Sequence, residues 1–154
     1  MRKHRFRGQD VNGWHYGDLQ HRTTVLLHRV GITIESRGAT VFYTCDPDSI
    51  GEGTGILDIN AERTRDTTKE IFEGDILRMP DRENFHSEIT GLVVYHNGSY
   101  VLAGDPENIE TCSKWNLYDA VHSQKAYVIG NIMDNPELLR GYIKDKVTWD
   151  IDCM

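Results

Sequence analysis

Short apolar runs, many of them β-branched, recur along the chain between Gly, Asn, Asp and Pro residues. Runs of about four to eight residues bounded by turn formers are typical of β-strands, whereas helices need longer amphipathic stretches. This pattern predicts a mainly β fold, with α+β as the alternative. The expected strands cover residues 14–19, 24–27, 32–34, 40–43, 76–78, 89–96, 99–102 and 126–129.

Asn97-Gly98 is the clearest local signal, because it lies between two apolar runs. Asn and Gly tolerate the positive φ angles of a two-residue type I′ turn, so a β-hairpin is predicted here. The hairpin would pair His96 with Ser99, Tyr95 with Tyr100, Val94 with Val101 and Val93 with Leu102. Side chains alternate across a sheet, so four residues should share one face and belong to the core: Val93, Tyr95, Tyr100 and Leu102.

One short C-terminal helix is expected. Asn135 is a favourable capping residue, Pro136 suits the first helical position, and Glu137 places an acid in the first turn. Apolar residues follow at helical spacing: Leu138, Leu139, Tyr142 and Ile143. Beyond the helix, residues 147–151 alternate between apolar and polar, which predicts a late strand or a segment that pairs with another chain.

A length of 154 residues suits a single domain over residues 1–154. Within it, residues 60–69 contain no apolar side chain larger than Ala, which indicates a long exposed loop. We interpret the chain as two lobes, a strand-rich N-terminal part (1–58) and a barrel plus helix (70–143), joined by loop 59–69.

Charge is distributed unevenly. Residues 1–37 carry seven basic and three acidic groups, a net +4, and residues 38–154 carry ten basic and 21 acidic groups, a net −11. The overall acidity excludes proteins that coat nucleic acid, which need many Lys and Arg. The basic segment could contact phosphate or another acidic partner, or it could be a solvated face that neutralises acidic surface.

Aromatic residues beside arginines can stack on nucleotide bases, although aromatics also fill small β cores. A nucleic-acid-binding protein would need the basic and aromatic residues of the N-terminal segment to converge on one face. The candidate binding residues are Arg5, Arg7, Trp14, Tyr16, Arg22 and Arg29.

No motif predicts catalysis or a bound metal. Residues 51–55 (GEGTG) lack the Lys and the following helix of a P-loop, so a crossing or bulge within a β fold is predicted. Asp46-Pro47-Asp48 comes without the Glu-x-Lys of metal-dependent nucleases and predicts a turn. The seven histidines form neither HxxxH nor HxH, and no GxSxG occurs. We expect no catalytic residue, metal or cofactor, and an uncharacterised enzyme is the least supported alternative.

Three cysteines, Cys45, Cys112 and Cys153, form no CxxC pair, and an odd number does not make a disulfide framework. A reducing compartment is therefore expected. The basic residues at the N-terminus are not followed by the apolar segment of a signal peptide, and no apolar run is long enough to cross a bilayer. We expect a cytoplasmic protein without a membrane partner.

Four stretches in order resemble the YopX family of phage and prophage proteins, from about residue 5 to residue 140. They are residues 6–10 (FRGQD) with 14–19 (WHYGDL), 46–51 (DPDSIG) with 54–58 (TGILD), 70–78 (EIFEGDILR), and 128–132 (VIGNI) with 134–139 (DNPELL). The chain departs from the family pattern at residues 59–69, which are longer than usual and lack a Gly, and in the tail from residue 144 to 154.

The resemblance implies a small, β-rich protein of the bacterial host cytoplasm, with no catalytic residues to transfer. Glu73-Gly74-Asp75 is similar to the start of SH3-like barrels, so a small barrel is expected over residues 70–133. The leading hypothesis is a phage or prophage accessory protein that acts by binding, as a protein-interaction module or a homo-oligomer. The alternative is a nucleic-acid-binding accessory protein that uses the basic N-terminal segment.

Overall fold

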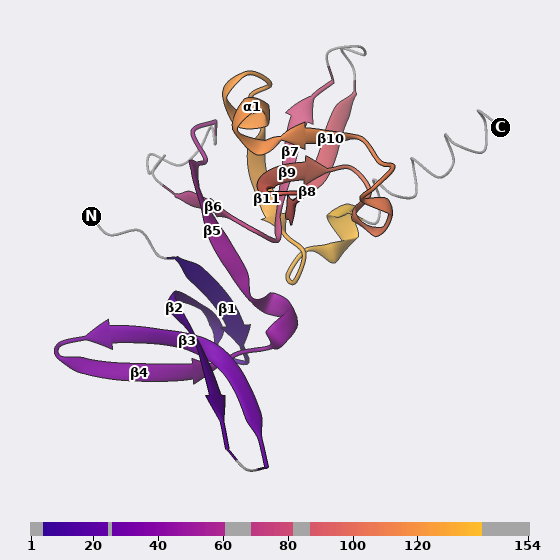
Figure 1. Ribbon diagram of the computed structural model, residues 1–154. Helices are drawn as coiled ribbons and strands as arrows, with labels where there is room; N and C mark the ends of the chain where they lie inside the picture. The colour runs from indigo at the N-terminus through magenta and orange to yellow at the C-terminus, as the bar shows by residue number, and fades with distance from the viewer. Residues whose placement is uncertain (1–4, 25, 61–68, 82–86, 140–154) are drawn as a thin grey trace. The chain divides into compact units, whose positions relative to one another are not determined.

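The computed structural model describes residues 5–24, 26–60, 69–81 and 87–139, and it forms two compact units (Figure 1). The N-terminal unit spans Met1–Gly55 and the C-terminal unit spans Ile56–Met154. The lobes expected at residues 1–58 and 70–143 stay a prediction, and most of the joining loop lies outside the described residues.

Consecutive antiparallel hairpins build the N-terminal unit. Its elements are β1 (Phe6–Asp10), β2 (Gly13–Thr23), β3 (His28–Ser36), β4 (Ala39–Thr44), the 3-10 helix η1 (Pro47–Ser49) and the start of β5 (Gly51–Leu57). The strands lie in the order β4-β3-β2-β1-β5, and the sheet continues to β6 (Glu70–Phe72). Turn residues explain the hairpins: Gly13 has a φ of 123°, and Arg37 and Gly38 both have positive φ between β3 and β4.

A second antiparallel sheet builds the C-terminal unit. Its elements are β7 (Asp75–Pro80), β8 (Glu88–His96), β9 (Ser99–Ala103), the 3-10 helix η2 (Pro106–Asn108), β10 (Lys114–Asn116), α1 (Leu117–His122) and β11 (Tyr127–Asn131). The order is β10-β9-β8-β7-β11. The two antiparallel sheets confirm the mainly β fold. Among the described strands no closed barrel is found, so the SH3-like barrel stays a prediction.

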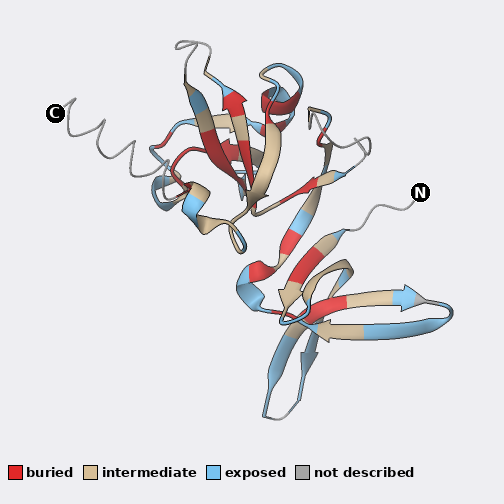
Figure 2. Ribbon diagram, turned by 180° about the vertical axis from the view of Figure 1, so that it is seen from behind, coloured by how far each residue is buried: buried red, intermediate tan, exposed pale blue. Residues whose placement is uncertain are grey.

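Two apolar clusters hold the second sheet. On one face Leu117, Ala120 and Val121 of α1 are fully buried against Leu77, Val93 and Leu102. On the other face Ile76 and Leu92 pack with Leu139. Buried residues are correspondingly concentrated in these strands (Figure 2). Glu73-Gly74-Asp75 opens β7 as a tight turn, in which the buried Asp75 carboxylate accepts the Phe72 N–H at 2.9 Å.

The Asn97-Gly98 hairpin is confirmed. The predicted register holds from His96–Ser99 to Val93–Leu102, and Asn97 and Gly98 have φ angles of 50° and 88°. The predicted core face is correct only in part. Val93 and Leu102 are fully buried, but Tyr95 lies close to the turn and is 57% exposed. Tyr95 and Tyr100 meet edge to face, with ring centroids 5.2 Å apart.

The strand predicted over residues 24–27 is wrong, because Thr24, Leu26 and Leu27 do not lie in a strand. Thr24 and Leu27 pair through their backbones and close the turn between β2 and β3, with the Thr24 N–H donating to the Leu27 carbonyl at 2.7 Å. The expectation failed because the strands on either side are longer than their apolar runs. Strands β1, β5, β6 and β10 lack a clear apolar signal and were not predicted.

Helical structure is limited in the described part of the chain. Residues 136–139 are helical, in agreement with the Asn135-Pro136 start signal. Tyr142, Ile143 and residues 147–151 lie outside the described residues. Helix α1 was not predicted, although Asn116 caps it by accepting the Asp119 N–H at 3.2 Å. No described helix is long and apolar enough to span a bilayer.

Candidate binding surface of the N-terminal unit

The register of the first sheet relates the candidate binding residues to one another. Arg7 of β1 pairs with Tyr16 of β2, and Arg22 of β2 pairs with Arg29 of β3. Directly paired residues point to the same face, as do residues two apart on one strand. Arg7, Trp14, Tyr16, Arg22 and Arg29 therefore lie on one face.

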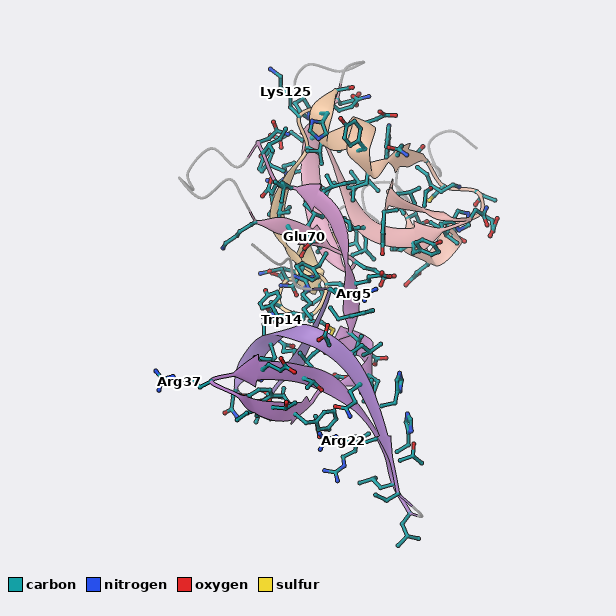
Figure 3. The ribbon with its side chains drawn as sticks, turned by 60° about the vertical axis from the view of Figure 1, so that its left-hand side comes forward. Arg5, Trp14, Arg22, Arg37, Glu70 and Lys125 are labelled. Carbon is teal, nitrogen blue, oxygen red and sulfur yellow. The ribbon has the colours of Figure 1, made fainter. Side chains whose placement is uncertain are left out.

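Arg5 precedes β1, is exposed, and accepts the Gly53 N–H through its carbonyl at 2.7 Å. Figure 3 labels Arg5, Trp14 and Arg22 in the N-terminal unit. The role of the six candidate residues in binding stays a prediction.

Arg7 and Trp14 form the inner part of this face. Arg7 is only 6% exposed, and its guanidinium carbon lies 4.5 Å from the centroid of the Trp14 ring. A cation over an aromatic ring is attracted to the negative face of the ring. Because Arg7 occupies one face of the half-buried Trp14 ring, this pair serves the packing of the sheet, and a base cannot stack on that face.

Arg22 and Arg29 form the outer part, and both are exposed. They are directly opposite each other across β2 and β3. Like charges at this position destabilise a strand pair. Arg22 gains one compensating contact, since its guanidinium carbon lies 4.1 Å from the centroid of the Phe42 ring.

These two arginines belong to a projecting part of the β2–β3 hairpin that we call the arm, residues 20–24 and 26–29. From His21 onward every described residue of the arm is exposed (Figure 2). Leu26 is 94% exposed and Leu27 is 53% exposed at its end. Residues 19–34 contain no Asp or Glu. The arm therefore combines basic strands with an apolar end.

Two histidines lie on the opposite face of the arm. His21 Nδ1 is 3.2 Å from His28 Nε2, and His28 Nδ1 is 2.8 Å from the Thr23 hydroxyl oxygen. Their rings stack with centroids 5.3 Å apart. Sequence reasoning missed this pair because His21 and His28 are seven residues apart, and only the hairpin brings them together. A hairpin predicted with Thr24 paired to Leu27 would place His21 and His28 on the same face.

A second cluster lies at the other end of the sheet. His15 Nε2 is 2.9 Å from Asp10 Oδ2, and the His15 ring stacks on Tyr43 with centroids 3.9 Å apart. The hydrogen bond from His15, with the Asn12 N–H as a further donor, lowers the pKa of Asp10. A pocket of about 660 Å³ opens beside it. Its lining residues are Gln9, Asp10, Val11, Phe42, Tyr43, Thr44 and Asp46.

Cys45 lies near this cluster but does not supply it with a nucleophile. Cys45 is 5% exposed, burial raises its pKa, and its Sγ donates to the Tyr43 carbonyl oxygen at 3.3 Å. A buried thiol with a raised pKa holds little thiolate and is a poor nucleophile. The Asp10–His15 pair is better explained as a contact that fixes the β1–β2 turn.

The motifs that resemble chemical sites have structural roles. Asp46 caps η1 by accepting the Asp48 N–H at 3.0 Å, which confirms the predicted turn. Residues 51–55 lie in β5, where Gly55 has a φ of 78°. Within the described residues no group of three or more His, Cys, Asp or Glu could hold a metal ion.

Comparisons with known proteins identify the fold. A family model described as "YopX protein" matches residues 18–140. The crystal structure of protein yopX from Bacillus subtilis is similar, with a TM-score of 0.52, 17% identity, and coverage of 90% of this chain and 97% of that one. A crystal structure from Enterococcus faecalis has 22% identity and a TM-score of 0.47, over 88% and 96% of the two chains. No curated protein matches.

Proposed function

From the premise that this chain belongs to the YopX family, we propose that it is a phage or prophage accessory protein of the host cytoplasm that acts by binding. The N-terminal unit makes the contact, and the arm is its contact element. The observation that carries this proposal is the exposure of the arm on both faces, together with its two exposed leucines.

Physical chemistry favours a bound partner for such an arm. A two-stranded ribbon is only marginally stable in water, and this one places Arg22 opposite Arg29. Exposed apolar side chains at its end add a further unfavourable contact with solvent. An acidic or polyanionic partner would relieve the repulsion between the arginines and cover Leu26 and Leu27. The arm is thus more favourable in a complex than alone.

Two kinds of partner fit the charge of the arm. One is a protein, including a second copy of this chain, because the C-terminal unit carries ten basic and 18 acidic groups over residues 56–154. The other is nucleic acid, supported by the two exposed arginines Arg22 and Arg29, which lie opposite each other on one face of the sheet. Both readings use the same surface.

Cross-linking and affinity capture in host cells test the proposal. The arm variant Arg22→Glu with Arg29→Glu reverses two charges. The control Arg37→Glu with Lys125→Glu makes the same change in net charge at two exposed positions outside the arm (Figure 3). We expect the wild type and the control to retain a stoichiometric partner that the arm variant loses. Equal recovery of every partner by all three proteins would contradict the proposal.

A further inference from the structure

We infer that the arm is a DNA-binding ribbon that enters a groove of double-stranded DNA, with Arg22 and Arg29 on phosphates and Leu26 against a base step. The inference rests on the proposed function and names the partner of the same surface. It is carried by three features of the described arm: the charge of its two arginines, the hydrogen-bonding groups on its opposite face, and its apolar end.

The charge of the arm fits a row of phosphates. Residues 19–34 hold two arginines and two histidines without an acidic residue. Arg22 and Arg29 are cross-strand partners on one face, so an anion between them is attracted by both. Phe42, 4.1 Å from the guanidinium carbon of Arg22, helps to fix that side chain in place. Arginine is the residue that suits phosphate, because its planar fork donates two parallel hydrogen bonds.

The second face of the arm also carries groups that can bind phosphate. His21, Thr23 and His28 form a hydrogen-bonded row there. Both ring nitrogens of His28 are engaged within the row, which leaves His21 Nε2 to donate to a phosphate oxygen, together with the Thr23 hydroxyl when His28 Nδ1 is the donor of their hydrogen bond. A groove of duplex DNA has a phosphate strand along each wall. Donors on both faces of one ribbon match two walls, whereas a flat surface would use only one.

Leu26, at the end of the arm, can act as an apolar wedge. Leu26 is 94% exposed and follows the last backbone pairs of the hairpin. Proteins that bend DNA insert apolar side chains such as Leu between base steps, which unstacks them partly and kinks the duplex. Such wedges enter from the minor groove, and DNA-binding β-ribbons use either groove. The arm therefore has both the cross-section and the apolar end that this mode of binding uses.

Other polyanions fit less well. Single-stranded nucleic acid needs aromatic faces on which bases stack, and the arm contains no Phe, Tyr or Trp. The major groove of duplex RNA is too deep and narrow to admit side chains. A bilayer would rely on Leu26 and Leu27, which bury less apolar surface than a myristoyl chain, and such a chain alone binds only marginally.

Fluorescence anisotropy with the full chain tests the inference. The probes are a short DNA duplex, its single strand, an RNA duplex of the same sequence, and vesicles that contain anionic lipid. We expect binding to the DNA duplex at low salt, with an affinity that falls as salt rises. For the arm variant Arg22→Glu with Arg29→Glu we expect the affinity for the duplex to fall at least about tenfold. The slope of log affinity against log salt concentration should decrease in magnitude by about two, because two phosphate contacts are lost.

The variant Leu26→Ser tests the contribution of the apolar wedge independently of the arginine charges. We expect this variant to bind the duplex more weakly with an unchanged salt slope, because no phosphate contact is lost. We also expect it to bend the duplex less, as measured by fluorescence energy transfer between dyes on the two duplex ends. Val11→Ser is the matched control, since Val11 is 100% exposed in the β1–β2 turn. The charge control is Arg37→Glu with Lys125→Glu. Thermal melting confirms that each variant is folded.

Several outcomes would overturn the inference. They are no duplex binding at low salt, equal binding by the wild type and the arm variant, or a preference for the single strand, the RNA or the vesicles. If the arm binds the vesicles or a second copy of the chain but not the DNA duplex, the DNA inference fails and the proposed function stands. If no partner of any kind depends on the arm, both fail.

Discussion

Asp10 and His15 show how single residues fix the turn that begins the N-terminal sheet. The Asp10 carboxylate receives the Asn12 N–H at 2.8 Å and lies 2.9 Å from His15 Nε2. Both contacts favour the charged carboxylate, and they lower the pKa of Asp10 from its ordinary value of 3.8. Since the folded pKa is depressed, this contribution to stability is present above about pH 4 and is lost as the pH falls through the folded pKa.

We expect Asp10→Asn to lower the free energy of unfolding at neutral pH and to have a smaller effect at acidic pH, as the pH falls through the lowered folded pKa of the wild-type carboxyl. Urea denaturation at the two pH values measures the difference. Asp48→Asn is the control for the loss of an exposed carboxylate in the same unit. An effect of Asp10→Asn that is the same at both pH values would contradict this explanation.

At the scale of elements, two hairpins differ in how much of their stability comes from packing. The β8–β9 hairpin ends in Asn97-Gly98 and places Val93 and Leu102 in the core. The β2–β3 hairpin ends in a turn closed by Thr24 and Leu27, and its outer part is exposed on both faces. The first hairpin is therefore a structural element, and the second is available to contact a partner.

The turn of the β8–β9 hairpin depends on Gly98, whose φ is 88°. We expect Gly98→Val to lower the thermal melting temperature strongly, because a β-branched residue strains at positive φ. Ser99→Val is the control, since Ser99 is exposed in β9 and its substitution does not require positive φ. Melting of the Gly98→Val protein at the wild-type temperature would show that the turn tolerates the change.

At the scale of the whole molecule, the two units differ in net charge. Residues 1–55 carry seven basic and six acidic groups, whereas residues 56–154 carry ten basic and 18 acidic groups. The basic groups of the arm and the acidic groups of the C-terminal unit of a second copy attract each other. This complementarity supports the expectation of a homo-oligomer.

Light scattering at micromolar concentration measures the oligomeric state. We expect an oligomer at low salt that dissociates at about 1 M salt, because the Debye length falls to about 3 Å there and screens the attraction between exposed charges. The arm variant Arg22→Glu with Arg29→Glu should be monomeric at low salt, whereas Arg37→Glu with Lys125→Glu should behave as the wild type. A monomeric wild type at low salt would remove the homo-oligomer from the proposal.

The success of sequence reasoning varied with the range of the interactions involved. The Asn97-Gly98 turn and its register follow from local backbone preferences, so they could be predicted residue by residue. Helix α1 escaped prediction because it is six residues long and its apolar residues suit a strand equally well. The exposure of Tyr95 was also missed, since alternation identifies a face but does not say where that face leaves the core.

The sequence by itself determined the mainly β class, the main hairpin, the start of the C-terminal helix and the family, because each depends on residues close together in the chain or on their order. Only the tertiary structure decided that Arg7 covers Trp14, that Arg22 faces Arg29, and that His21 meets His28. These contacts depend on how far β2 and β3 extend before they turn. That length is fixed by pairing between strands, which local propensity does not specify.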